Sequence, residues 1–393
     1  MTFVAVEDLF ETRNGYTPSK ADASNWTEGT VPWFRMEDIR ENGRVLGSAI
    51  QQIPASAVKG GRLFPANSII VATSATIGEH ALITVPFLSN QRFTALWLKP
   101  QFAARFDVKF VFYYCFVLDE WCRNNTTTSS FASVDMDGFR RFRFPLPPLE
   151  VQREIVKILD GFTELQAELR AELEARRWQY RNYRDALLTF PAANGIKRTP
   201  IGEFAELVRG NGLPKTDFTE SGVGAIHYGQ IYTYYGTWAD ETKSFVAPET
   251  AAKLAKVDPG DVVITNTSEN IEDVGKAVAW LGAEQVVTGG HATVIKHSQN
   301  PKFLAYYFQT AEFSSAKRRY AFGTKVIDVS AKSLAKIDIP LPSRNEQDRI
   351  VSILDKFDSL VNDLSIGLPA ELNARRKQYE YYRDRLLTFP EAA

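Results

Sequence analysis

One stretch of this sequence occurs twice. Residues 175–191 read ARRWQYRNYRDALLTFP and residues 374–390 read ARRKQYEYYRDRLLTFP, with the same residue at 13 of the 17 positions. The similarity extends N-terminally, because PLPPLEVQREIVKILDGF from Pro145 aligns with PLPSRNEQDRIVSILDKF from Pro340. Each copy therefore consists of a Pro-Leu-Pro segment followed by one long predicted helix. Two such helices, one closing each half of the chain, constrain everything else that the sequence can fold into.

Both predicted helices carry the apolar period of a coiled coil. Large side chains recur at alternating steps of four and three residues between Phe162 and Phe190, and again between Phe357 and Phe389. The second copy is longer by four residues, an insertion that adds about one turn and nearly restores the phase of the apolar face. Gly367 and Pro369 interrupt this region, so we expect a kink or a short break there.

Charged positions outside the apolar seam recur as well, since Arg177 and Arg184 reappear as Arg376 and Arg383. Two explanations remain open. These residues either pair across an antiparallel helix dimer, or they dock the same surface on two copies of one partner protein. The candidate partner-binding residues are Arg177, Tyr180, Tyr183, Arg184, Arg376, Tyr379, Tyr382 and Arg383.

Length and composition indicate a globular protein of two domains plus the helices. The chain has 393 residues, of which 44% are hydrophobic and 24% charged. Neither a signal peptide nor a run of about 18 apolar residues is visible, so we expect no membrane association and a cytoplasmic location. The two cysteines, Cys115 and Cys122, are predicted to be reduced core thiols.

The predicted order is domain, helix, related domain, helix, which gives an α+β fold with boundaries at 1–144, 145–192, 193–339 and 340–393. In the first domain, strands are predicted at 68–73, 81–85 and 93–98 and a helix at 108–123. The second domain repeats this order with different residues. Residues 262–265 correspond to 69–72, the segment 288–293 corresponds to 89–94, and a helix over 302–320 corresponds to the one from Val108.

Catalytic motifs are missing from the sequence. It contains neither a GxxxxGK phosphate loop nor a GxGxxG motif. The stretch Asn300-Pro301-Lys302-Phe303 lacks the second proline of the amino-methyltransferase motif, and the four histidines have no zinc-finger spacing. We therefore expect no catalytic residue, no metal site and no cofactor bound by this chain.

These repeats resemble a known family. The Pro-Leu-Pro-x-x-x-x-Gln segments, the TELQ-AELR-AELE tetrads, GLPAEL at 367–372 and the two ARRxQYxxYRDxLLTF stretches look like the specificity subunit of type I restriction-modification systems. The resemblance implies two target recognition domains, each reading one half of an interrupted, asymmetric site in double-stranded DNA. It also implies that the long helices form an antiparallel coiled coil.

The same resemblance implies the partners. They would be two copies of a methylation subunit that uses S-adenosylmethionine, and restriction and translocation subunits that use ATP and Mg²⁺. A helix of about 40 residues would span roughly 60 Å, more than the roughly 34 Å of one duplex turn. Such a helix could therefore set the spacing between the two half-sites.

Reading bases requires polar, often forked side chains on loops, with further contacts to phosphate. The net charge of −1 argues against a protein that simply coats nucleic acid, but it is compatible with a reader that presents a local basic face. The basic clusters near 140 and 317 are either solvated surface or phosphate contacts. The candidates are Arg35, Thr73, Ser74, Asn90, Gln91, Arg92, Arg140 and Arg141 in the first half, and Tyr228, Gln230, Tyr232, Thr267, Ser268, His291, Lys317, Arg318, Thr324 and Lys325 in the second.

The sequence thus favours a DNA-sequence reader that also scaffolds its partners. The alternative is a non-catalytic adaptor, in which the coiled coil joins two proteins and the globular domains bind proteins or peptides. Sequence-dependent, salt-sensitive DNA binding would distinguish the reader from the adaptor.

Overall fold

The computed structural model of the chain describes residues 1–127, 132–191, 195–362 and 365–390. The chain divides into two compact units, the first made of Met1–Ala167 with Ala374–Ala393 and the second of Glu168–Asn373. Each unit therefore joins one globular domain to parts of both predicted helices.

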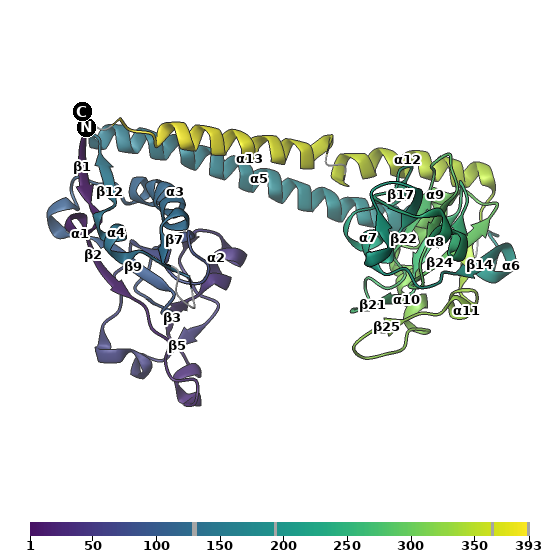
Figure 1. The fold of residues 1–393 in the computed structure, drawn as a ribbon, viewed down its shortest axis with the longest axis horizontal. Coiled ribbons are helices and arrows are strands. Elements are labelled where there is room, and N and C mark those ends of the chain that lie inside the picture. Colours follow the sequence, from purple (N-terminus) through teal and green to yellow (C-terminus); the bar gives the residue numbers. More distant parts are fainter. Residues whose placement is uncertain (128–131, 192–194, 363–364, 391–393) are drawn as a thin grey trace. The chain divides into compact units, whose positions relative to one another are not determined.

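A five-stranded sheet with the order β2-β9-β6-β7-β4 forms the centre of the first domain, and a smaller sheet has the order β5-β3-β8. Strands β6, β7 and β9 and helix α3 lie within two residues of the predicted elements. Figure 1 shows α3 beside β7. The elements are β1 Thr2–Ala5, α1 Val6–Leu9, β2 Phe10–Asn14, β3 Val31–Phe34, α2 Met36–Asn42, β4 Val45–Leu46, β5 Gln52–Ile53, β6 Ser68–Ala72, β7 His80–Ile83, β8 Leu88–Ser89, β9 Phe93–Leu98, α3 Val108–Asn124, β10 Thr126–Thr127, β11 Ser133–Val134, α4 Met136–Arg141 and β12 Arg143–Leu146.

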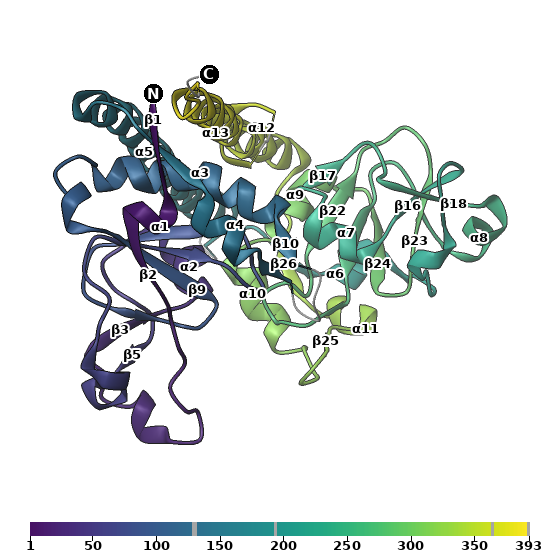
Figure 2. The ribbon, with the colours of Figure 1, turned by 60° about the vertical axis from the view of Figure 1, so that its left-hand side comes forward.

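The second domain repeats this architecture, with sheets of order β14-β24-β20-β22-β17 and β15-β18-β16-β23-β19 (Figure 2). The sheets β2-β9-β6-β7-β4 and β14-β24-β20-β22-β17 match each other, because in each the last strand pairs parallel with its neighbour and all other pairs are antiparallel. The elements are β13 Arg198–Pro200, α6 Ile201–Phe204, β14 Ala205–Arg209, β15 Phe218–Thr219, β16 Val223–Ile226, α7 Tyr228–Thr233, β17 Trp238–Ala239, β18 Ser244–Val246, α8 Pro248–Lys253, β19 Ala255–Val257, β20 Val262–Thr265, β21 Thr267–Ser268, β22 Ala277–Trp280, β23 Val286–Thr288, β24 Ala292–His297, α9 Pro301–Tyr307, α10 Ala311–Arg318, β25 Ile327–Asp328, α11 Ala331–Leu334 and β26 Asp338–Pro340.

The prediction of one helix in the second domain is wrong. The helix expected over 302–320 is divided into α9 and α10. The hydroxyl of Thr310 accepts a hydrogen bond from the backbone N–H of Phe313 at 3.2 Å and so starts a new helix. A Thr side chain at this position can cap the N-terminus of a new helix, which ends the preceding one. The spacing of apolar residues does not show where such a cap forms.

The long helices form as predicted, including the break in the second copy. Helix α5 runs without interruption from Leu149 to Leu188, whereas the second copy consists of α12 (Arg344–Asn362) and α13 (Gly367–Leu386). Gly367 has φ +72°, a backbone conformation that favours glycine, and Pro369 lies in the first turn of α13, where its missing N–H removes no helical bond.

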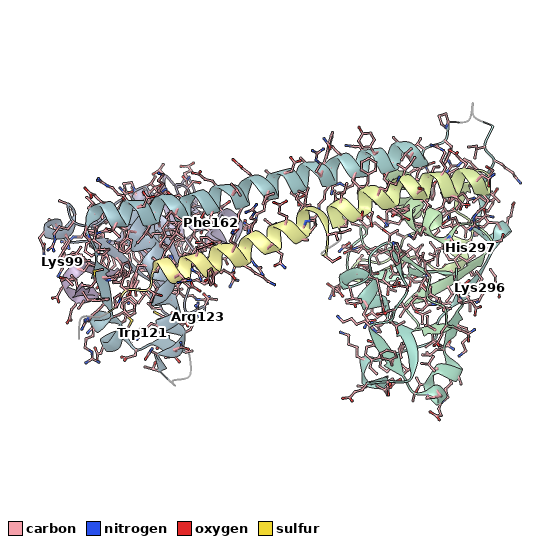
Figure 3. All side chains as sticks on the ribbon, turned by 90° about the horizontal axis from the view of Figure 1, so that it is seen from above. Lys99, Trp121, Arg123, Phe162, Lys296 and His297 are labelled. Atoms are coloured by element: carbon pink, nitrogen blue, oxygen red, sulfur yellow. The ribbon has the colours of Figure 1, made fainter. Side chains whose placement is uncertain are left out.

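Within each unit the two helices run antiparallel. In the first, the ring of Phe162, labelled in Figure 3, stacks on that of Tyr382 at 5.5 Å. Gln166 reaches the carbonyl of Arg375. In the second, Tyr183 stacks on Phe357 at 5.9 Å, and Arg177 reaches the carbonyl of Val361. Because residue numbers rise along one helix as they fall along the other, the predicted antiparallel pairing is confirmed.

A fully buried glutamine joins each helix to its domain. The amide oxygen of Gln152 accepts from the N–H of Asp107 at 2.8 Å, and its amide nitrogen donates to the carbonyl of Pro147 at 2.8 Å. Gln347 makes the equivalent bonds to Asn300 and Pro342, both at 2.9 Å. This is the physical reason for the glutamine in both Pro-Leu-Pro-x-x-x-x-Gln segments.

The two cysteines lie buried and free in α3, as predicted. Burial, reinforced by Asp119, raises the pKa of the Cys115 thiol well above its ordinary value and that of Cys122 to about 12. Across the described part of the chain, we find no helix with the length and apolarity that crossing a membrane requires.

Candidate nucleic-acid interface

A pocket of about 600 Å³ opens in the first unit beside α2 and the loop that follows β8. Strands β3 and β8 are parallel, so Arg35 and Asn90, which follow them, lie at the same sheet edge. Four predicted residues, 35 and 90–92, meet here. The pocket is lined by Thr17, Lys20, Trp26, Trp33, Arg35, Met36, Glu37, Arg40, Gln51, Thr76, Asn90, Gln91 and Arg92.

Hydrogen bonds from backbone N–H groups to side-chain oxygens fix the two segments that carry these side chains. The N–H of Arg35 donates to the carboxylate of Asp38 at 2.7 Å, and the other oxygen of this buried carboxylate accepts from Ile50 at 2.6 Å. The side-chain oxygen of Asn90 accepts from the N–H of Arg92 at 3.0 Å. The pocket therefore has a rigid base, while its lining includes four cationic side chains and one carboxylate.

The second unit has a pocket of about 390 Å³ beside α7 and β21. The ring of His291 lies 4.7 Å from that of Tyr228, and its Nδ1 lies 2.9 Å from the hydroxyl oxygen of Thr267. The hydroxyl of Tyr232 donates to the carbonyl of Thr267 at 2.6 Å, and burial raises the pKa of Tyr232 to about 12. The lining residues are Tyr228, Tyr232, Thr267, Ser268, Glu269, Asn270, Asp273, His291 and Val326, five of which the sequence predicted.

The two pockets occupy equivalent places in the two domains. The carbonyl of Arg92 accepts from the N–H of Thr73 at 3.0 Å, and the carbonyl of His291 accepts from the N–H of Asn266 at 2.8 Å. A second pair of hydrogen bonds repeats the match. The N–H of Val134 donates to the carbonyl of Thr73 at 2.9 Å, and the N–H of Val329 donates to the carbonyl of Asn266 at 2.8 Å. The predicted correspondence of segments 89–94 and 288–293 is therefore confirmed, with Arg92 and His291 as counterparts.

Thr73 belongs to this framework and lies outside the pocket. Its hydroxyl shares a hydrogen bond with Thr94 at 2.9 Å, and both side chains are buried. The second unit replaces this pair with Asn266 and Thr293 at 2.8 Å. The structure thus places Thr73 beneath the site that it was predicted to line.

Gln230 is also a framework residue. Its amide oxygen accepts from the N–H of His227 at 3.3 Å, and its amide nitrogen donates to Ser244 at 2.6 Å. In the first unit Asp38 accepts a hydrogen bond from the N–H of Arg35 in the same way. His227 therefore corresponds to Arg35. Burial, followed by the charge of Lys215, lowers the pKa of His227.

The two candidates in the basic cluster near 317 differ in their surroundings. Lys317 is buried and donates to the carbonyls of Glu272 and Val274, and burial lowers its pKa to about 8. Arg318 pairs with Glu272 at 3.0 Å. Lys317 therefore supports its own domain, and Arg318 remains at the surface beside an acid.

The remaining candidates line neither of these two pockets. Arg140 pairs with Asp137 at 3.0 Å, and Arg141 is exposed. Ser74 is half-buried and bridges to Ser133, close to the first pocket's Thr76. Thr324 and Lys325 are exposed on the loop that leads into β25, the strand paired with β21 of the second pocket.

Several lining residues were missed by sequence reasoning. In the first pocket these include Lys20, Trp26, Trp33 and Arg40, which come from a loop, a strand and a helix that only the fold brings together. In the second they include Glu269, which follows Ser268 directly, and Asp273, five residues after Ser268; both could have been found by extending the predicted loop. No group of three or more His, Cys, Asp or Glu suited to a metal occurs among the described residues.

Comparison with known families decides what kind of protein carries these pockets. The family model described as "Type I restriction modification DNA specificity domain" matches residues 1–175 and 195–374. The chain belongs to this family. Such specificity subunits are the non-catalytic, DNA-recognition members of their systems, so the prediction that this chain is not an enzyme is confirmed by its relatives.

Two curated relatives from Escherichia coli are similar to this specificity subunit. The type I restriction enzyme EcoprrI specificity subunit is 42% identical over 382 residues, covering 92% of this chain and 89% of that protein. The EcoR124I/EcoR124II specificity subunit is 32% identical over 301 residues, covering 72% and 71%. A chain in a solved structure described as "Structural basis underlying complex assembly and conformational transition of the type I R-M system" shares the fold, with a TM-score of 0.67, 17% identity and coverage of 98% and 97%.

Half of the predicted partner-binding residues of this specificity subunit pack against its own domains. Arg184 is buried, pairs with Asp185 at 2.8 Å and reaches Gln309 at 3.4 Å. Its counterpart Arg383 lies over the ring of Phe116 at 4.6 Å. Tyr180 and Tyr379 are likewise part of the domain cores. The repeat of these four residues follows from packing within each unit, a contact that neither of the two sequence explanations considered.

The other half stays on the surface. Tyr183 and Tyr382 are 56% and 42% exposed although each stacks on a phenylalanine of the opposite helix. Arg177 pairs with Glu174 at 2.9 Å, and Arg376 lies 3.8 Å from Glu380. These four residues remain available to a partner, together with Trp178, which is 62% exposed and was not predicted.

Proposed function

We propose that this chain reads a bipartite, asymmetric site in double-stranded DNA, with one half-site bound at each pocket. The observation that carries the proposal is the equivalence of Arg92 and His291, which the same backbone hydrogen bonds hold in the two domains. A common framework with different side chains at the equivalent place suits two domains that dock on duplex in the same manner and read different bases.

The chemistry of the pockets supports this proposal. The first pocket presents Arg35, Arg92, Asn90 and Gln91, the side-chain types that form bidentate contacts with guanine and adenine. The second presents Glu269 and Asp273, whose carboxylates can accept from the amino group of cytosine, beside tyrosine and histidine rings. The cationic first pocket would also supply much of the attraction for phosphate.

The proposal extends to partners and cofactors. Two copies of a methylation subunit would bind the exposed helix residues Arg177, Tyr183, Arg376 and Tyr382, because the sequence repeat presents each type of side chain twice. Restriction and translocation subunits would join that assembly. S-adenosylmethionine, and ATP with Mg²⁺, would be bound by these partners and not by this chain.

A gel-shift experiment tests the DNA part of the proposal. The chain, assembled with its methylation subunit, is mixed with a pool of randomised duplexes at two salt concentrations, and the bound fraction is sequenced. We expect a consensus in the bound pool and weaker binding at the higher salt concentration. Binding without any consensus, or no binding, would favour the adaptor over the DNA reader.

A further inference from the structure

The equivalent positions of the two pockets carry different chemistry. Arg35 corresponds to His227, because each residue follows the matching strand and is capped by a side chain three residues later, Asp38 or Gln230. Arg92 corresponds to His291. The first unit therefore has two guanidinium groups where the second has two imidazoles.

We propose that Arg35 is the specificity-determining residue of the first pocket and reads a guanine, and that Arg92 contacts phosphate. The proposal rests on the DNA-reading function proposed above and names the base and the residue that reads it. It also separates two arginines that the sequence alone treats alike.

Arg35 is held in place before any ligand binds. Its guanidinium lies 5.7 Å from the ring centroid of Trp33, and about a third of its side chain is exposed at the pocket. Its Nε is buried without a hydrogen-bond partner among the residues described, and the carboxylate of Glu37, at 3.9 Å, is too far for a hydrogen bond. Because Nε is buried, the exposed part of the Arg35 side chain is what would donate hydrogen bonds to a ligand that supplies acceptors.

The chemistry of guanine matches this donor. Guanine presents two acceptors, O6 and N7, in the major groove, and the forked guanidinium can bond to both at once. Adenine replaces one acceptor with an amino donor, which a donor-only arginine cannot satisfy. A preorganised arginine therefore selects guanine with little loss of side-chain entropy.

Arg92 lacks these restraints. Its side chain is exposed and makes no hydrogen bond, ion pair or ring contact with any residue that the structure describes, although its backbone is fixed by Thr73 and Asn90. A mobile cation on a fixed backbone suits phosphate, which attracts charge without requiring a defined orientation.

His227 cannot replace Arg35 in this role. It is buried, and its Nδ1 accepts from the N–H of Gly229 at 3.1 Å, so the ring is occupied in capping α7. At the position of Asn90 the second unit has Gly289, where a Cβ atom would lie 2.5 Å from the Cβ of Leu213. The second pocket therefore reads its half-site with other residues.

Base analogues test the proposal on the full chain assembled with its methylation subunit. After the site has been selected from randomised duplexes, each guanine in it is replaced in turn by 7-deazaguanine, which lacks the N7 acceptor. We expect one guanine at which the wild-type complex loses roughly 5- to 150-fold in affinity. Arg35→Ala should bind both duplexes equally, and Arg35→Lys should keep the charge but lose most of the discrimination.

Arg92→Ala should behave differently from both Arg35 variants. It should weaken binding to all sequences, keep the 7-deazaguanine effect, and reduce the slope of log affinity against log salt by about 1. The matched control is Arg62→Ala, which removes another exposed arginine of the same unit that does not line the pocket. This control should leave both affinity and discrimination unchanged.

Two outcomes overturn the inference while leaving the proposed function intact. The first is a wild-type complex that selects a site but shows no N7-dependent guanine, a result that does not depend on the folding of any variant. The second is an Arg35→Ala variant that keeps the 7-deazaguanine penalty. A wild-type complex that selects no site at all would instead contradict the proposed function.

Discussion

The carboxylate of Asp160 accepts a hydrogen bond from the hydroxyl of Tyr113 at 2.7 Å and so joins helix α5 to helix α3. Lys109 pairs with the same carboxylate at 2.6 Å. The second unit repeats this arrangement, with Tyr306 and Lys302 both at 2.8 Å from Asp355. Each domain is therefore fixed on its helix by the same lysine, tyrosine and aspartate.

Removing the tyrosine hydroxyl at this junction should destabilise the first unit. We expect Tyr113→Phe to lower the free energy of unfolding by about 1–2 kcal/mol, because a hydrogen bond to a charged acceptor is lost. Hydrogen exchange of the α3 amides measures the effect within that unit. Asp137→Ala, which breaks an exposed ion pair of the same unit, is the control and should change little. Equal protection of α3 in Tyr113→Phe and wild type would count against this role.

Acid should destabilise the second unit through His297, which lies at the end of β24 beside Lys296 (Figure 3). Burial lowers its pKa to about 4, whereas an unfolded histidine titrates near 6.5. Between these values the unfolded state binds the extra proton, so the stabilisation present above about pH 6.5 is lost as the pH falls. From about pH 7.5 to about pH 5 we expect a loss of about 2 kcal/mol from this residue.

The variant His297→Asn isolates this effect, because the asparagine oxygen can replace Nδ1 as acceptor for the N–H of Gln299. Urea unfolding at several pH values should show a smaller acid destabilisation in the variant than in the wild type. If both proteins lose the same stability between these pH values, His297 does not titrate as described.

Charge reversal on the exposed helix surface should impair assembly more than folding. Arg177→Glu combined with Arg376→Glu should weaken binding of the methylation subunit, measured by analytical ultracentrifugation, with a small change in melting temperature. Arg349→Glu, at an exposed position on α12 paired with Glu346, is the matched control. Intact assembly in the double variant would leave Arg177 only its contacts with Glu174 and Val361, and Arg376 only its contact with Glu380.

Shortening α5 should change the spacing between half-sites. Deleting Ala167–Arg170 removes one tetrad, about 6 Å of helix. We expect selection from randomised duplexes to return the same two half-sites with a different number of unread bases between them. An unchanged spacer would show that α5 does not set the separation.

Much of the fold could be predicted because it depends on local signals. The segments 89–94 and 288–293 were matched by their pattern alone, and the hydrogen bonds of Arg92 and His291 confirm that match. Gly367 marked the break between α12 and α13 through its backbone freedom. Such features depend on the residue itself and its near neighbours.

The roles of single polar side chains depend instead on distant neighbours. Thr73 and Gln230 look like loop residues suited to reading bases, yet Thr94 and Ser244 bind them in the framework. Arg184 looks like a free surface charge, but α10 and its neighbouring turn cover it through Asp185 and Gln309. The sequence identifies the loops, and the tertiary contacts decide which of their side chains remain free.

The central claim is that each pocket reads one half of the site. Comparing the sites selected by Arg35→Ala and His291→Ala complexes from the same randomised duplexes tests it most directly. The account predicts that Arg35→Ala relaxes base preference in one half-site only and His291→Ala in the other only. Relaxation of the same half-site by both variants, or of both half-sites by either one, would contradict it.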